Sequence, residues 1–458
     1  MFRSIHVYKN FCKINKIFIR TIGKAAFSRL LKSHFFAFSF LYNYFSTFAA
    51  MKNEPQIIKL RNGIRVVLQQ AQSNVVYCGL MIGAGSAHEQ ENEHGIAHFI
   101  EHVLFKGTKK RSALDICYGL EHDGGELNAF TSRESTIIYS IVQNSQFEKA
   151  LEIICDLVFN SIFPETELEK EKNVIISEIN STNCNISEVI YDKSIQFLFN
   201  GDAIGKPILG TKKSVKSFTA DSVRNFIKRN YVNGNMALSV VGNVALEDLI
   251  ALSNKYLMKY NNDAKPMKPA KITDYKPYKK EFLSDSAQAF CILSNRAYRV
   301  NDKRSVGLSL LTNILGGPIF SSRLNLSLRE QYGLVYDIST SYEAFTNTGV
   351  FQIYFETAKK NLKKSIKLTL AELEILREKK ITKSKLDYAK HRFIGQLIIQ
   401  NENYEQRMID NAKMLLLFGR IETIEKQKTK INALAAADLH QIANEIFDEN
   451  MLSFISYT

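Results

Sequence analysis

The chain has 458 residues, of which 45% are hydrophobic and 23% charged, with a formal net charge of +14. This composition is typical of a globular protein of roughly two to four domains, and it excludes disordered and collagen-like chains. No apolar run reaches the roughly 18 residues of a membrane-spanning helix, so we expect no integral membrane segment. Six scattered cysteines without a C-x-x-C pair argue against a disulfide scaffold or a cysteine-ligated zinc site.

Much of the positive charge lies in residues 1–50. This segment has eight Lys or Arg residues and no Asp or Glu, which leaves 52 basic against 46 acidic residues elsewhere. The rest of the chain is therefore only mildly basic, and we expect no nucleic-acid partner. The basic leader fits a mitochondrial transit peptide or an over-extended start, and more loosely a signal peptide or anchor. The expected location is cytoplasmic if translation starts at Met51, and the mitochondrial matrix if the leader is a transit peptide.

Strand and helix patterns alternate from residue 56 onward. The Asn62-Gly63 pair between β-branched runs predicts the first hairpin. The predicted elements are, in chain order, a hairpin at Gln56–Gln69, a buried strand at Val75–Ile82, helices at 95–106 and 112–122, strands at Glu126–Thr131 and Ser135–Val142, and one long helical stretch from Gln146 to about Ile190.

The second half of the chain repeats a pattern of the first. A helix that opens near Asp221 ends near Met236 before a strand, and a similar helix runs from Asp438 to Met451, with offsets of 217 and 215 residues. This repetition suggests two copies of one α+β unit. A segment with three of the seven prolines separates them. The predicted organisation is an N-terminal domain at 51–258, a linker at 259–280 and a C-terminal domain at 281–458.

A histidine motif indicates a metal site in the first half. His98, Glu101 and His102 lie in an apolar helical pattern, where they share about 100° of one helix face. Two imidazoles one turn apart can hold a single ion, and zinc suits this choice of ligands. The plain alternative is a pair of helical histidines near the surface with a neighbouring carboxylate.

A third ligand is expected on the acid-rich helix predicted at 165–180. Glu171 and Glu178 lie on one face of it but about 10 Å apart along the axis, so they cannot both touch one ion. Glu178 lies in the most apolar part of the helix, where a carboxylate needs a charged partner. Glu178 is therefore the candidate ligand.

The residues from His94 to Thr108 resemble the metal helix of the inverzincins, the family of pitrilysin, insulin-degrading enzyme and mitochondrial processing peptidase. That family has its third ligand in an E-x6-E pair about 76 residues downstream, which is the place of Glu178, with Glu171 as the first glutamate. The resemblance covers residues 56–458, and the chain as a whole is similar to the bacterial two-domain members of the family. It implies an α+β protein with two homologous α/β domains, each a mostly antiparallel sheet packed against helices, and no metal site in the second.

Two further matches concern substrate binding. Asn128, Ala129 and Phe130 lie in a segment that resembles the edge strand on which family members lay an extended substrate, although an interior hairpin with Phe130 in the core is the alternative. Arg329 and Tyr336 resemble the Arg-x6-Tyr pair that contacts substrate near the metal. Their alternative role is purely structural, at a helix end and on the next strand.

The resemblance implies a zinc metalloendopeptidase that cleaves extended or unfolded peptides inside a closed chamber. The cofactor would be Zn2+, one per chain. The implied roles are zinc ligation by His98, His102 and Glu178, proton transfer by Glu101, oxyanion stabilisation by Tyr336 with Arg329, and orientation of the site by Glu171.

The size of the chain bears on its partners, because family members that enclose a chamber have four repeated domains. The resemblance therefore implies a homodimer, or a heterodimer with a related subunit, in which Arg329 and Tyr336 of one chain face the metal of the other. Two alternatives remain: a subunit of a mitochondrial presequence-processing peptidase, and a non-catalytic structural subunit. Structural subunits usually lose a zinc ligand or the base, whereas this sequence retains the three implied zinc ligands and the implied base, Glu101.

Overall fold

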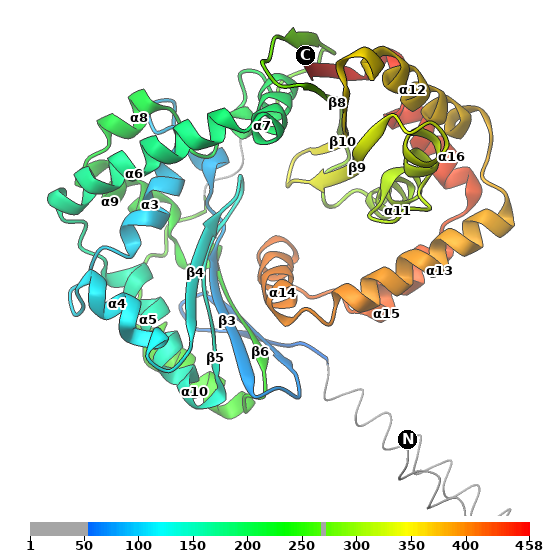
Figure 1. Ribbon diagram of the computed structural model, residues 1–458. Coiled ribbons are helices and arrows are strands. Elements are labelled where there is room, and N and C mark those ends of the chain that lie inside the picture. The colour runs from blue at the N-terminus through cyan, green and yellow to red at the C-terminus, as the bar shows by residue number, and fades with distance from the viewer. Residues whose placement is uncertain (1–53, 267–271) are drawn as a thin grey trace, which may run out of the picture. The chain divides into compact units, whose positions relative to one another are not determined.

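Two mixed sheets, one in each half of the chain, organise this computed structural model, which describes residues 54–266 and 272–458 (Figure 1). The predicted leader at 1–50 lies outside the described residues, as does part of the predicted linker at 259–280. Residues 55–458 form one compact unit. Within the described ranges, no helix combines the length and apolarity needed to cross a bilayer.

The first sheet has six strands in the order β1-β2-β6-β3-β5-β4. Its strands are antiparallel to their neighbours except for the parallel pair β2–β6. The strands are β1 (Gln56–Lys59), β2 (Arg65–Gln70), β3 (Val75–Ile82), β4 (Glu126–Thr131), β5 (Thr136–Gln143) and β6 (Met236–Gly242). The predicted hairpin and strands of this half are confirmed, and Gly63 takes the left-handed φ of 94° that its turn requires.

The second sheet has five strands in the order β7-β11-β8-β10-β9, with one parallel pair, β7–β11. The strands are β7 (Lys279–Phe282), β8 (Gln288–Ala297), β9 (Val335–Ala344), β10 (Gly349–Ala358) and β11 (Ser453–Tyr457). This order matches five strands of the first sheet, β2-β6-β3-β5-β4. The predicted fold, two similar units with mostly antiparallel sheets packed against helices, is confirmed.

The helices of the first half correct one prediction. They are α3 (Ile96–Leu104), α4 (Ala113–Glu121), α5 (Phe147–Asn160), α6 (Glu165–Cys184), α7 (Ile186–Leu198), α8 (Lys212–Ser217), α9 (Ala220–Asn230) and α10 (Leu246–Tyr256). The single helical stretch expected from 146 to 190 is wrong, because three helices occupy it. Phe163 has a left-handed φ of 51° before Pro164, the N-cap of α6, and the Asn185 side chain accepts a hydrogen bond from Ser187 N–H to begin α7.

The second half repeats the helix order of the first. After β8 come α11 (Ser305–Gly316) and a π-helical segment (Asn325–Gln331), and after β10 come α12 (Leu362–Glu378), α13 (Lys383–Gln400), α14 (Tyr404–Phe418), α15 (Ile424–Ala433) and α16 (Ala436–Ile446). In this order α11 takes the place of α3, α13 that of α6, and α14 that of α7. The repeated helix–strand finish is confirmed as α9 before β6 and α16 before β11.

Each sheet is covered on one face by a helix of the other half. Helix α14 lies across the first sheet beside β3 and β6 (Figure 1), where Met408 packs against Met81 and Ile137. A Cβ added at Gly79 would lie 2.5 Å from the Met408 sulfur, so the helix and the strand approach closely. Helix α7 covers the second sheet in turn, with Ile190 packed against Ile292. The two halves therefore share their apolar faces.

Candidate active site

Helix α3 is fixed in place at its N-terminus. Gly95, its N-cap, has a φ of 88°, and a Cβ there would lie 2.7 Å from the Leu209 carbonyl oxygen, so the position requires glycine. The N-cap offers no side chain; instead the carboxyl of Glu89 accepts hydrogen bonds from the N–H groups of Gly95 (2.9 Å) and Ala97 (3.0 Å). Burial raises the pKa of Glu89 to about 8. These contacts fix the rotation of α3.

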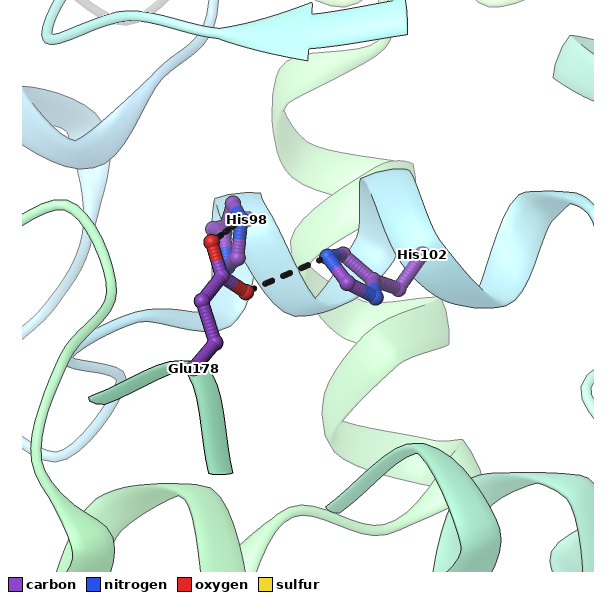
Figure 2. A group of neighbouring side chains, drawn as sticks. All are labelled: His98, His102 and Glu178. Atoms are coloured by element: carbon purple, nitrogen blue, oxygen red, sulfur yellow. Dashed lines mark ion pairs between the residues drawn. The ribbon is translucent and has the colours of Figure 1, made fainter. Parts of the chain in front are cut away.

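The structure brings His98, His102 and Glu178 together, two from α3 and one from α6 (Figure 2). His98 Nε2 lies 3.7 Å from Glu178 Oε1, and His102 Nε2 lies 3.6 Å from Glu178 Oε2. In a tetrahedral zinc site with bonds of about 2.0–2.1 Å, neighbouring ligand atoms are about 3.3 Å apart. The three donor atoms, which lie within 4.8 Å of one another, therefore fit a zinc ion, and no other such group occurs among residues 54–266 and 272–458.

The pKa values of the two imidazoles shift in opposite directions. Burial lowers the pKa of His98 to about 4, and neighbouring His102 adds to this effect, so His98 is neutral at pH 7, as a metal ligand must be. Burial also lowers the pKa of His102, but the hydrogen bond with Glu171 and the negative charges of Glu178 and Glu101 outweigh it, so the net shift is upward. Negative charge therefore surrounds His102, which favours a cation at this position.

Glu171 orients the second histidine. Its Oε2 lies 3.1 Å from His102 Nδ1 and its Oε1 lies 2.7 Å from the Lys106 ammonium. Burial raises the pKa of Glu171, but the hydrogen bonds from His102 and Lys106 outweigh it, and the carboxyl group stays ionised. With Nδ1 so engaged, Nε2 of His102 points at Glu178, an arrangement common behind metal-bound histidines. The sequence analysis missed Lys106, although it lies one helical turn beyond His102.

Glu101 lines the same cavity as His98 and Glu178. Burial raises the pKa of Glu101, and its interactions with Thr131 and His102 partly oppose that shift. The atom Oε2 is buried and has no hydrogen-bond partner among the described residues. An unsatisfied buried carboxyl oxygen is rare outside functional sites, which marks Glu101 as a candidate functional residue.

The cavity beside these residues has a volume of about 700 Å³ and both halves contribute to its wall. Four carboxyl groups besides Glu101 and Glu178 line it: Glu188 and Asp192 from α7, Asp337 from β9 and Glu356 from β10. The sequence analysis missed all four. Glu188 and Asp192 could have been found by their spacing of four residues on one helix face, but nothing local marks the other two.

Strand β4 lies at the edge of its sheet next to this cavity. Ser132 N–H donates to Ser135 O, so by antiparallel alternation the N–H and C=O groups of Ala129 and Thr131 point away from β5. The side chain of Asn128 is exposed, and that of Phe130 is 36% exposed and lines the cavity rather than the core. In the described part of the chain, the outward backbone groups of Ala129 therefore have no backbone partner, and the next two residues of the strand line the cavity.

Arg329 and Tyr336 lie outside this group. The Arg329 guanidinium lies 5.1 Å from the ring centre of Phe320 and 5.9 Å from that of Tyr336, and Tyr336 is 80% exposed. Neither residue lines the cavity, although Asp337, the next residue along β9, does. Within one chain, the structure does not bring this pair to His98, His102 and Glu178.

Comparisons with known proteins agree along most of the chain. Residues 65–212 match the insulinase family (peptidase family M16), and residues 217–393 match the peptidase M16 inactive domain. An uncharacterized zinc protease of Bacillus subtilis, YmxG, is 32% identical over 394 residues, which cover 85% of this chain and 95% of that protein. An uncharacterized zinc protease of Rickettsia bellii is 33% identical over 412 residues, 88% of this chain and 98% of that protein.

Solved structures show the same fold. A peptidase M16 inactive domain from Pseudomonas fluorescens superimposes with a TM-score of 0.82 at 19% identity, covering 88% of this chain and 97% of that one. A protease from Helicobacter pylori gives 0.82 at 21% identity, with 89% and 99% coverage. The resemblance found in the sequence is confirmed, and the chain belongs to the insulinase family of peptidases, family M16.

Proposed function

We propose that the chain is a zinc-dependent endopeptidase that cleaves extended or unfolded peptides. The observation that carries the proposal is the convergence of His98, His102 and Glu178. Two of these residues, His98 and Glu178, line a cavity together with Glu101. The zinc proteases of Bacillus subtilis and Rickettsia bellii support the choice of metal. Zn2+, when bound, would supply Lewis-acid chemistry, because it raises the acidity of water and polarises a carbonyl group.

Glu101 is the proton carrier in this proposal. Its carboxylate, which lines the cavity, accepts a proton from the attacking water and later gives it to the leaving amine. The raised pKa of Glu101, caused mainly by burial, suits both the acceptance of the proton and its later release. Glu171 keeps His102 in the orientation that directs Nε2 to the metal position.

The edge of β4 would hold the substrate. An extended peptide added as a further strand would pair with the outward N–H and C=O groups of Ala129, while Asn128 and Phe130 contact its side chains. Such binding reads the backbone rather than a sequence and requires an unfolded segment. This requirement favours extended peptides over folded proteins.

The positions of Arg329 and Tyr336 support assembly of two chains. Tyr336 is exposed and Arg329 is partly exposed on the second half, and neither lines the cavity of its own chain, so a partner chain's cavity could receive them. We therefore include a homodimer, or a heterodimer with a related subunit, in the proposal, with Tyr336 and Arg329 stabilising the oxyanion in the partner's site. Two chains arranged in this way would enclose a chamber.

Metal analysis together with cleavage of a quenched flexible peptide tests the chemistry. We expect about one zinc per chain in the wild type and in Glu101→Gln, with chelator-sensitive cleavage in the wild type and loss of most turnover in the variant. Full activity in Glu101→Gln would refute the base assignment. Absence of both zinc and cleavage would favour a structural subunit.

Subunit complementation tests the arrangement across chains. Glu101→Gln and Tyr336→Phe chains, each nearly inactive alone, should recover about a quarter of wild-type activity when mixed and exchanged, because mixed dimers contain one intact site. No recovery, despite mixed dimers seen by mass spectrometry, would count against a site shared between chains.

A further inference from the structure

The turn between β4 and β5, residues 132–135, follows directly after the strand proposed to bind the substrate. Ser132 N–H donates to Ser135 O at 2.7 Å, which closes the turn. The main chain of the turn also holds the segment that leads into α3, because Ala87 N–H donates to Arg133 O at 2.7 Å. The turn is therefore fixed to the part of the chain that carries the two histidines.

The side chain of Arg133 reaches a second wall of the cavity, formed by α7. Arg133 is 8% exposed, and its guanidinium donates to the carbonyl oxygens of Ile204 at 3.2 Å and Lys206 at 2.9 Å, in the segment that follows α7. The same group donates to Oδ1 of Asp192 at 3.4 Å, and Asp192 lines the cavity. A guanidinium presents its five N–H donors in a fixed fork, so it can hold two carbonyl groups and a carboxylate at once. Arg133 therefore fixes α7 and the following segment relative to β4.

The next side chain, Glu134, reaches the wall that the second half contributes. Thr346 N–H, in the turn between β9 and β10, donates to both carboxyl oxygens of Glu134, at 2.9 and 3.0 Å. A hydrogen bond to a carboxylate is roughly twice as strong as a neutral one. The neighbouring Phe345 is buried in one apolar cluster with Ile204, so this turn packs against the segment that Arg133 holds. Strands β9 and β10 both line the cavity, and Glu134 therefore ties that wall to β4.

We infer that Arg133 and Glu134 are positioning residues that set the distance between β4 and the other walls of the cavity, and with it the fit of a bound peptide. The inference rests on the proposed function and deepens it, because it names the side chains that shape the substrate site around β4. Their side-chain contacts are with α7, the segment after it and the second half rather than with α3. Their loss should therefore weaken substrate binding and leave the chemical step on α3 intact.

Kinetics of Glu134→Ala and Glu134→Gln on the quenched flexible peptide test the inference. Alanine removes the acceptor of the Thr346 N–H, so we expect KM to rise about tenfold with kcat within about twofold and zinc content unchanged. Glutamine keeps one acceptor oxygen and should recover most of the loss. Arg133→Lys keeps the charge but loses the fork, and should also raise KM about tenfold. A chain that is only destabilised would instead lose active protein, which lowers kcat and leaves KM as it was.

Asp438→Ala is the matched control. It also removes a carboxylate that accepts from a backbone N–H, that of Ala435 at 2.7 Å, but this contact lies at the start of α16 and should leave KM unchanged. An unchanged KM in Glu134→Ala and Arg133→Lys, or an equal rise in Asp438→Ala, overturns the inference.

Hydrogen exchange decides the question without turnover. In Glu134→Ala, the amides of residues 199–206 and 345–350 should exchange about tenfold faster than in the wild type, with those of α11 unchanged. If the wild type cleaves no peptide, the proposed function fails, but exchange in the two segments can still be compared. Faster exchange there supports a role of Glu134 in holding the wall, and unchanged exchange overturns it.

Discussion

The helix pairs α3–α6 and α11–α13 occupy the same places in the two halves but are joined by different chemistry. In the first pair, His98 and His102 face Glu178, and in the second, the Asn313 amide donates to Gln396 Oε1 at 2.8 Å. The residues of α11, SVGLSLLTNILG, include no titratable side chain. A neutral amide bond needs no counter-charge, whereas two histidines and a carboxylate in contact are poised for a cation.

Helix pairs at equivalent positions of the same fold can therefore carry different side-chain chemistry. Strand order and helix order are the same in both halves, so packing alone does not require the charged residues of α3. Burial disfavours the charged forms of His98 and Glu101, and such perturbed groups cluster at functional sites, which agrees with the proposed function. The second half keeps the architecture and closes the equivalent contact with an amide pair.

The largest expected effect separates the two helix pairs directly. Glu178→Ala should abolish zinc binding and lower peptide cleavage on the order of a thousandfold or more, because a ligand is lost. Gln396→Ala, the matched change on α13, should leave zinc content and cleavage unchanged and cost about 1 kcal/mol of stability. Metal analysis, cleavage assays and urea unfolding distinguish them. Equal zinc loss in both variants would contradict the assignment of the metal to the first half.

The shared apolar faces predict a stability effect that crosses the halves. Met408→Ala, in the second half, should destabilise the first sheet by about 2–4 kcal/mol, because Met408 is fully buried against Met81 and Ile137. Met451→Ala, at a 39% exposed methionine, should change stability by less than about 0.5 kcal/mol. Urea unfolding measures both. A Met408→Ala variant as stable as the wild type would show that α14 does not support the first sheet.

The histidine pair predicts a pH dependence that the amide pair lacks. Because the pKa of His98 falls from 6.5 to about 4 on folding, the unfolded chain binds the proton first as the pH drops. In chelator-treated protein this group should therefore cost about 3 kcal/mol of stability between pH 6.5 and 4, with no further change below pH 4. His98→Gln should lack that part of the slope in urea unfolding. Identical slopes in the two proteins would contradict the assigned burial.

The smallest effect concerns the cavity wall, to which both halves contribute carboxylates. Glu188→Gln and Glu356→Gln should each lower kcat/KM for peptides with a lysine or arginine near the scissile bond by about tenfold relative to neutral peptides. The effect should shrink as salt is added. Glu374→Gln, on the exposed surface of α12, is the control and should change nothing. An effect at only one of the two wall residues would assign substrate charge recognition to one half.

Local pattern was sufficient for the elements that carry the site. The apolar periodicity around His98 predicts α3, and the apolar sequence around Glu178 singles out this residue as the third ligand. The burial expected for Glu178 is wrong, because its side chain is 40% exposed. The break between α6 and α7 escaped prediction because it depends on one residue, Asn185, which caps the second helix within a continuous helical pattern. Hydrophobic periodicity shows that one face of a helix is buried. Because α6 and α7 each bury one face, the pattern does not mark the break between them.

Contacts between distant segments could not be predicted in the same way. Arg65 on β2 donates to the Leu415 carbonyl oxygen of α14, 350 residues away, and no local signal connects them. Asp337 and Glu356 reach the cavity only because the second sheet lies against α7. Their role in the cavity wall follows from tertiary packing, which a single sequence does not display.

The exchange of α7 and α14 gives one chain the geometry of a domain-swapped dimer. In such an arrangement, each unit contributes the helix that covers the sheet of the other unit. Either half produced alone would therefore expose an apolar sheet face to water, with Met81 and Ile137 in the first half or Ile292 and Tyr354 in the second. We therefore expect the two units to unfold together in a single transition. Removal of either exchanged helix should therefore destabilise the opposite half of the chain as well as its own.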